Sequence, residues 1–171
     1  MRIQLAWLVV LGVACVSGGC SKSAPSPGKV VALDQVCNEP DHGRVRLTGY
    51  VRYRREMLSF CSSFGGHKTC DLQLNASADA PPDFDVLHPQ KGPAPLSAQL
   101  SVPVGDHPGE MDDIPDKFKT SDIKLHLPNS AIAGDGSKVT VDGVVSVIPT
   151  DPKTPAAPKS CFVTLEWAAA G

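Results

Sequence analysis

The chain has 171 residues, a formal net charge of −2 and 42% hydrophobic residues, which suits one domain with its own core. This near-balanced charge excludes the strongly basic composition that is usual in nucleic-acid-binding domains. The 16 prolines, the 15 glycines and the lack of a heptad pattern favour short strands and turns over long helices.

The first 20 residues predict an export signal. One positive charge, Arg2, precedes an apolar run from Ile3 to Val16, and small residues follow the run. The run is too short to cross a bilayer as a helix. We therefore expect residues 1–19 to be a signal peptide that is absent from the mature protein.

The segment Val16-Ser17-Gly18-Gly19-Cys20 resembles the lipobox of bacterial lipoproteins. In that family a peptidase cleaves just before a cysteine, whose sulfur is diacylated. The resemblance implies that Cys20 becomes the lipidated first residue and that its acyl chains, of the palmitate kind, hold the protein on a membrane. An ordinary signal peptide with a chance cysteine is the alternative.

Residues 20–29 are polar and contain two prolines, which predicts a flexible tether. By resemblance to enterobacterial sorting rules, Ser21 after the cysteine favours the periplasmic face of the outer membrane. We expect residues 30–171 to form a single β-barrel domain, which begins at 29–36 with a short helix or a first strand.

Residues 43–54 predict the central strand of this domain. Their side chains alternate between an apolar and a cationic face, as in a half-buried strand. Gly49 falls in mid-strand, where a missing side chain usually marks a bulge or a bend. The apolar face carries Val45, Leu47, Gly49, Val51 and Tyr53, and the other face carries Arg44, Arg46, Thr48, Tyr50, Arg52 and Arg54.

Two further strands are predicted at 57–61 and 70–76. The loop between them, 62–69, has Gly65-Gly66 at its tip and is typical of a hairpin. In the second of these strands we expect the inward side chains to be those of Cys70, Leu72, Leu74 and Ala76.

A proline-rich insertion occupies about residues 77–109 and includes a possible edge strand at 96–104, where Pro103 would block open pairing. A short helix is expected at 110–121, and alternation predicts a strand at 122–127.

Residues 137–145 repeat the pattern of 43–51: small, basic, Val, polar, aliphatic, polar, Gly, any residue, Val. A polar loop at 149–160 leads to a last strand at 161–167, whose inward residues are expected to be Cys161, Val163, Leu165 and Trp167.

Five main strands, with glycine-bent first and fourth strands, resemble an OB-fold of the tRNA-anticodon-binding-like class. In such barrels the first strand bends so that it pairs in both halves of the barrel. The resemblance implies an all-β fold with minor helix, built as a small five-stranded antiparallel barrel. An immunoglobulin-like or other β-sandwich is the alternative.

Four cysteines lie in the predicted domain, and an exported domain with four cysteines suggests two disulfides with three possible connectivities. We favour Cys61–Cys70, which would clamp the hairpin, and Cys37–Cys161, which would tie the start of the domain to its last strand. A zinc site recruiting Cys61, His67 and Cys70 is the alternative, but that spacing matches no common tetrahedral site.

The cationic strand face is the candidate ligand site. By resemblance to OB domains, it could bind a phosphate-bearing polymer or an oligosaccharide through charge pairing and stacking. The alternative is that these arginines form cross-strand ion pairs, for example with Glu166 or Asp71. The candidate residues are Arg44, Arg46, Tyr50, Arg52 and Arg54.

An acidic stretch could bind calcium, although it lacks the alternating ligands and mid-loop glycine of a known calcium loop, and a solvated helix start is the simpler interpretation. Its carboxylates are those of Glu110, Asp112, Asp113 and Asp116.

No Ser-His-Asp signature, Gly-x-Ser-x-Gly motif or phosphate loop is present in the sequence, so we expect neither an enzyme nor a bound cofactor or metal. The sequence predicts a non-enzymatic, lipid-anchored protein of the bacterial cell envelope with an OB-like binding module. Its expected partners are an anionic glycan, a lipid head group or an acidic protein, and nucleic acid is not expected. The alternative is a structural or assembly subunit that docks on another envelope protein.

Overall fold

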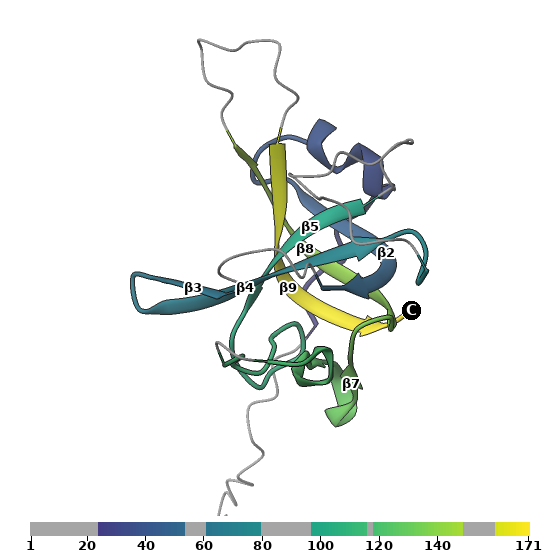
Figure 1. Cartoon of the computed structure of the whole chain (residues 1–171). Coiled ribbons are helices and arrows are strands. Elements are labelled where there is room, and N and C mark those ends of the chain that lie inside the picture. Colours follow the sequence, from purple (N-terminus) through teal and green to yellow (C-terminus); the bar gives the residue numbers. More distant parts are fainter. Residues whose placement is uncertain (1–23, 54–60, 80–96, 116–117, 149–159) are drawn as a thin grey trace, which may run out of the picture.

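A computed structural model describes residues 24–53, 61–79, 97–115, 118–148 and 160–171 (Figure 1). It contains one seven-stranded mixed sheet, in the order β1-β2-β8-β9-β5-β4-β3, and a two-stranded ribbon of β6 and β7. Three 3-10 turns complete the described secondary structure: η1 (Leu33–Asn38), η2 (Thr120–Asp122) and η3 (Pro128–Ser130). The strands are β1 (Lys29–Val30), β2 (Arg44–Arg52), β3 (Cys61–Phe64), β4 (His67–Asn75), β5 (Ser97–Pro103), β6 (Leu125–His126), β7 (Ile132–Ala133), β8 (Lys138–Ile148) and β9 (Ser160–Ala170).

Five strands of the large sheet close into a ring. β2 pairs with β8 from Arg44 to Tyr50, and then with β4 from Tyr50 to Arg52. β4 pairs with β5, β5 with β9, and β9 with β8. The spatial order β8-β2-β4-β5 is a Greek key, which β9 closes by lying between β5 and β8.

The all-β prediction is confirmed, but the sheet is not wholly antiparallel. β5 and β9 run parallel, as do β1 and β2. The parallel pair in the ring follows from the topology: β8 runs antiparallel to β9 and to β2, and β4 runs antiparallel to β2 and to β5.

β2 has the alternation that the sequence predicts. Val45, Leu47, Gly49 and Val51 are buried, while the residues between them are exposed or half-buried. At Gly49 an added Cβ would lie 2.7 Å from the main-chain oxygen of Asn75. The missing side chain lets β4 approach β2 where β2 exchanges one partner strand for the other.

The two similar stretches of sequence form β2 and β8, which pair antiparallel with Leu47 opposite Val141. This register sets Val45 opposite Gly143, and Gly49 opposite Val139. Each glycine also makes room for a further strand, because an added Cβ at Gly143 would overlap with the main chain of β9. The repeated pattern therefore places one close strand approach on either side of the β2–β8 pair.

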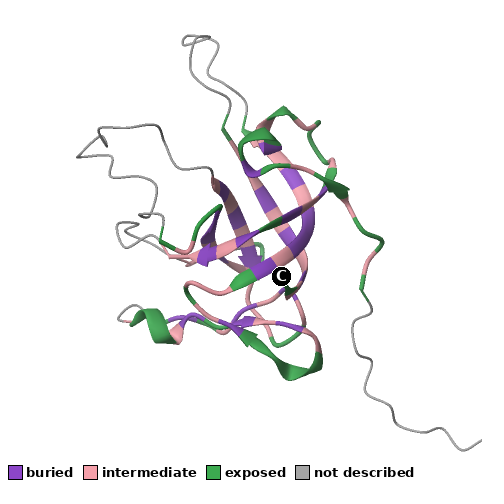
Figure 2. Cartoon of the chain, turned by 90° about the vertical axis from the view of Figure 1, so that its right-hand side faces the viewer, coloured by how far each residue is buried: buried purple, intermediate pink, exposed green. Residues whose placement is uncertain are grey.

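Figure 2 shows the buried positions along the ring strands, and the chain covers both ends of the barrel. At one end η1 buries Leu33 and Val36 against the ring. At the other end lies the segment that joins β5 to β8, including the β6–β7 ribbon (Figure 1). That segment adds Met111, Ile114, Ile123, Leu125, Leu127 and Ala133 to the core.

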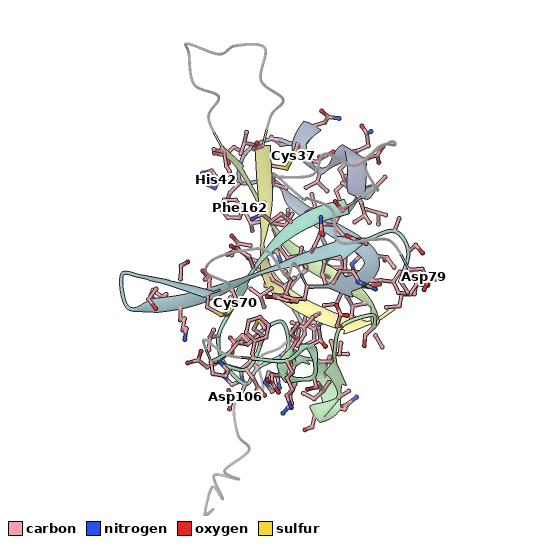
Figure 3. The ribbon with its side chains drawn as sticks, in the orientation of Figure 1. Cys37, His42, Cys70, Asp79, Asp106 and Phe162 are labelled. Carbon is pink, nitrogen blue, oxygen red and sulfur yellow. A yellow bond between two sulfur atoms is a disulfide. The ribbon has the colours of Figure 1, made fainter. Side chains whose placement is uncertain are left out.

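Both favoured disulfide pairings are present. Cys61 and Cys70 are directly opposite in the β3–β4 hairpin, and Cys37 in η1 is bonded to Cys161 in β9. Figure 3 shows them at separate places, with Cys37 near one end of the barrel and Cys70 where the hairpin leaves it. The zinc alternative is therefore wrong, because its two cysteines are bonded to each other.

The β3–β4 hairpin has a tighter turn than predicted. Its strands run to Phe64 and from His67, so the connection is Gly65-Gly66 alone. Both glycines have positive φ angles, 58° and 82°, as a two-residue hairpin of this hand requires. Of the predicted strand at 57–61, residues 57–60 lie outside the described residues.

The prediction of an edge strand at 96–104 is wrong, because the strand there, β5, has a neighbour on each side. It lies between β4 and β9, and its pattern of alternating buried residues faces the core. Pro103 is tolerated at its last position because β5 pairs with β9 only at Leu100 and Ser101, so the missing proline amide interrupts no strand pairing. Its carbonyl accepts a hydrogen bond from the Met111 amide, at 3.0 Å.

Two inward positions were predicted wrongly. Ala76 is exposed because β4 ends at Asn75. Trp167 is only half-buried, and Ala168 takes the inward position. The reason is a bulge: Asp142 pairs with Trp167 but Gly143 pairs with Leu165, so Glu166 is an extra residue that shifts the alternation.

The expected helix at 110–121 is absent from the described part of that range. Met111 instead forms isolated bridges with Val104 and Leu125, and among the described residues of this range the only helical turn is η2. The Met111 amide donates to the Pro103 carbonyl, and the Met111 carbonyl accepts from the Gly105 amide, so Met111 cannot make helical hydrogen bonds. The strand predicted at 122–127 is shorter, Leu125–His126, and the range 29–36 divides between β1 and η1.

Candidate functional site

The predicted ligand face lies on the outside of β2, and its arginines have partners. Arg44 pairs with Glu166 of β9 at 2.6 Å, as the ion-pair alternative expected. Arg46 pairs with Asp142 of β8, also at 2.6 Å. Arg52 donates to the carbonyl of Ala78 and lies 3.7 Å from a carboxylate oxygen of Asp135.

The other two candidate residues of this face are Tyr50 and Arg54. Tyr50 is half-buried and lies in register with Lys138 on β8 and Asn75 on β4. Arg54 lies outside the described residues. Ligand binding by the β2 face stays a prediction, and a ligand there would compete with the carboxylates that already hold the arginines.

Asp142 is the most buried ionisable group of this face. Its side chain is only 2% exposed and receives three hydrogen bonds from the Arg46 guanidinium and one from the Gly28 amide, at 2.8 Å. Burial alone would raise the pKa of the Asp142 carboxyl. The opposing effect is larger, because Arg46 and Gly28 donate hydrogen bonds to the carboxylate and the charges of Arg46 and Arg44 stabilise it. The pKa therefore lies below its ordinary value.

This carboxylate fixes the start of the domain. Gly28 lies so close to β2 that an added Cβ would overlap with the main chain of Val45. β1 then continues along β2, with Lys29 opposite Val45 and Val30 opposite Arg46. The last two residues of the predicted tether, Gly28 and Lys29, therefore lie on β2, and Arg46 helps to hold them through Asp142.

A second polar surface, which sequence reasoning missed, lies on the outer faces of β4 and β5. Asp71, Gln73 and Asn75 stand opposite Ser101, Gln99 and Ser97 respectively. The signal was available, because both stretches alternate polar with apolar residues. We call this set of six residues the β4–β5 polar face.

Two amides of the β4–β5 polar face are buried. Gln73 is 6% exposed and donates to the Ser97 hydroxyl at 3.1 Å. Asn75 is fully buried, yet neither its side-chain oxygen nor its nitrogen has a hydrogen-bond partner. A buried amide without a partner is costly, and such groups often belong to sites that are completed by water or a ligand.

The acidic stretch that suggested calcium is divided among other contacts. Asp112 binds His126 at 2.8 Å and lies 3.6 Å from the Lys124 ammonium. Asp113 pairs with Lys68 on β4. Asp116 lies outside the described residues. A shared calcium site is not formed by the described members of this stretch, because their carboxylates bind different partners.

A different group, Asp106, His107 and Glu110, offers one ligand atom each within 4.8 Å of one another. It lies in the turn that follows β5, where Figure 3 labels Asp106. Within the described chain no other group of three histidine, cysteine or carboxylate side chains is as close.

Comparison with known proteins found no matching family model and no matching curated protein. Among the described residues, no helix has the length and apolar character needed to cross a membrane.

Proposed function

We propose that this chain is a non-enzymatic, lipid-anchored protein of the bacterial cell envelope whose barrel is an OB-fold used for binding. The observation that carries the proposal is the closed Greek-key ring of five strands, because the OB-fold is a five-stranded Greek-key barrel. Its first strand, β2, pairs with both β8 and β4, as the first strand of such a barrel does.

The two disulfides support the envelope location. Disulfides persist in oxidising compartments and are rare in the reducing cytosol. The lipid anchor rests on the resemblance of residues 16–20 to a lipobox, and Cys20 lies outside the described residues. Gly28 is held on β2 and is eight residues beyond Cys20, so even a fully extended chain between them would keep Gly28 within about 28 Å of the anchor.

We place the binding surface on the half-buried residues of the β4–β5 polar face, which are Asp71, Ser97, Gln99 and Ser101. In OB-folds the second and third strands, here β4 and β5, carry the ligand. The face combines amides and hydroxyls with one carboxylate. On β2, Arg44 and Arg46 are each paired with a carboxylate. Hydroxyl-rich polymers match such donors and acceptors, so the proposed ligand is a cell-wall glycan. The β2 face remains the alternative surface, for an anionic glycan, a lipid head group or an acidic protein.

The anchor is tested by the intact mass of the protein purified from a membrane fraction, with and without reduction and alkylation. We expect a mass that corresponds to cleavage before Cys20 plus acyl chains, and four alkylated thiols that appear only after reduction. An unacylated mass, or four thiols that react without reduction, would contradict the anchor or the oxidising compartment respectively.

Binding is tested by cosedimentation of the purified protein with isolated cell-wall sacculi. We compare Gln99→Ala, on the half-buried outer side of β5, with Arg44→Ala on β2. We expect Gln99→Ala to lower the bound fraction at least threefold and Arg44→Ala to leave it unchanged. Loss of binding only in Arg44→Ala would move the site to the β2 face, and no sedimentation of the parent protein would refute the glycan proposal.

The assembly-subunit alternative keeps a separate test. It expects docking through apolar loop residues such as Phe64, Phe84 and Leu87, of which Phe84 and Leu87 lie outside the described residues. Crosslinking in intact cells that captures one envelope protein, and that is lost in Phe64→Ser but not in Gln99→Ala, would favour it over glycan binding.

A further inference from the structure

The turn between β5 and β6 brings three side chains of mixed metal-binding character together. Asp106, His107 and Glu110 supply two carboxylates and one imidazole. The Nδ1 atom of His107 lies 3.7 Å from a carboxylate oxygen of Asp106. Ligand atoms on a tetrahedral zinc ion, each about 2.1 Å from the metal, are separated by about 3.4 Å, so small side-chain rotations close the group around an ion.

The main chain of this turn is fixed on both sides. The Gly105 amide bonds to the Met111 carbonyl and the Glu110 amide bonds to the His107 carbonyl, at 3.0 and 2.9 Å. The Gly109 amide bonds to His126 at 2.9 Å. Gly109 has a φ of 90°, and an added Cβ would lie 2.7 Å from Cα of Trp167, so the turn is packed directly on β9. A metal would therefore bind ligands whose backbone is already positioned.

Gly105 leaves the space that the Glu110 carboxylate occupies. An added Cβ at Gly105 would overlap with Oε2 of Glu110. The same oxygen accepts a hydrogen bond from the His107 amide at 3.1 Å. The glutamate is thus directed back over its own turn, toward His107.

A second imidazole stands on the facing strand. Met111 bridges Leu125, and this register places Glu110 opposite His126. His126 is 19% exposed, and its Nε2 lies 2.8 Å from a carboxylate oxygen of Asp112. A carboxylate that holds one nitrogen of a histidine, and so orients the ring, is common beside metal sites. This pair adds a second imidazole and a third carboxylate beside the turn.

We propose that Asp106, His107 and Glu110 bind one divalent transition-metal ion of the zinc class. An imidazole together with two carboxylates suits zinc, nickel or cobalt better than calcium or magnesium, which prefer oxygen ligands alone. Asp106 and His107 are exposed, so the ion would keep coordination positions for water or for a donor from a bound partner. His126, which lies opposite Glu110 in the register, is a further imidazole on the facing strand.

This site differs from the acidic stretch in the sequence and from the proposed glycan surface. Only Glu110 belongs to both acidic groups. A sequence signal existed, since Asp106-His107 and Glu110 lie within five positions and each is preceded by a glycine. It was not decisive, because only the turn at 107–110 directs Glu110 back toward His107.

The test is calorimetric titration of the purified, oxidised, tag-free protein with Zn²⁺, after alkylation of any free thiols. We expect one ion per chain with micromolar or tighter affinity, and a visible ligand-field spectrum when Co²⁺ replaces Zn²⁺. His107→Ala and Glu110→Gln should each weaken binding at least tenfold. The matched control is His42→Ala, because His42 is also an exposed histidine beside an aspartate.

Gly105→Ala separates a metal site from a general effect of removing ligands. It keeps all three donors but displaces Glu110, so we expect at least fivefold weaker Zn²⁺ binding with an unchanged melting temperature of the metal-free protein. The proposal is overturned if the parent chain takes up no Zn²⁺ at 1 mM, or if His107→Ala and His42→Ala bind it equally well. Neither result depends on glycan binding or on the lipid anchor.

Discussion

Replacing Gly49 with alanine is expected to open the ring at the junction of β2 with β4. The new Cβ would lie 2.7 Å from the Asn75 carbonyl oxygen and 2.8 Å from Cγ of Leu74, whereas ordinary contacts begin at 3.4 Å. One strand must therefore move by about 0.7 Å in a close-packed interior. The atoms in the way include main chain of β4, which cannot turn aside as the end of a flexible side chain can.

The cost can be estimated from the register. Overpacking a core typically destabilises a protein by about 1–3 kcal/mol. The junction consists of only three residue pairs, from Tyr50–Asn75 to Arg52–Gln73, so displacement there weakens the whole β2–β4 contact. Alanine also restricts the unfolded chain, which offsets about 0.4–1 kcal/mol. We expect a net loss of about 1.3 kcal/mol and a melting temperature lower by about 4 °C.

The assay is urea unfolding followed by circular dichroism, with Gly134→Ala as the matched control. At Gly134 the nearest heavy atom to an added Cβ is the Ile123 oxygen at 3.5 Å, and the backbone is outside the left-handed region. The same substitution should therefore be neutral or slightly stabilising there. A Gly49→Ala variant within about 0.5 kcal/mol of the parent, or two variants with equal losses, would refute the close approach of β2 and β4.

Three further results are expected. Removing the Cys37–Cys161 bridge should cost more stability than removing Cys61–Cys70, by the entropy model about 5 against about 3 kcal/mol, because the sequence separations are 124 and 9 residues; equal urea midpoints for the two double-serine variants would contradict this. The depressed pKa of Asp142 gives stability that is present above the ordinary carboxyl pKa of about 3.9 and is lost as the pH falls through the lower folded value. Between pH 5 and pH 2 the urea midpoint should therefore fall less in Asp142→Asn than in the parent, and parallel curves would be the opposing result. Limited proteolysis should cleave before Gly28 sooner in Asp142→Asn, and unchanged cleavage would show that this carboxylate does not hold the tether.

Much of the fold follows from local pattern. Alternation located β2, β8 and β9, because a strand with one buried face needs an apolar side chain at every second position. Gly49 and Gly143 were recognised as a pair because the residues around them match. The cysteine pairing followed from placing Cys61 and Cys70 on the two strands of one hairpin.

The errors have a common physical origin in contacts between distant segments. Nothing within Ser97–Pro103 tells whether that strand is an edge or lies between β4 and β9. The inward position of Ala168 depends on the bulge that Glu166 makes against β8. Met111 is extended because it pairs with Leu125, although the sequence at 110–121 predicts a helix. The candidate site was limited in the same way for Arg46, whose partner Asp142 lies 96 residues further along the chain, whereas Glu166 was expected as a partner of this face.

The bridge between Cys37 and Cys161 also determines how the molecule would respond to tension on its N-terminus. A pull applied ahead of β1 could peel away its two residues and then η1, but at Cys37 the force would divide and pass across the bridge into β9. β9 is flanked by β8 and β5, so the load would spread into the middle of the sheet. Everything between the two cysteines lies inside a covalent loop and cannot lengthen while the bridge is intact. In single-molecule stretching between the two termini, only the segments before Cys37 and after Cys161 would extend, and reduction would release the remaining length.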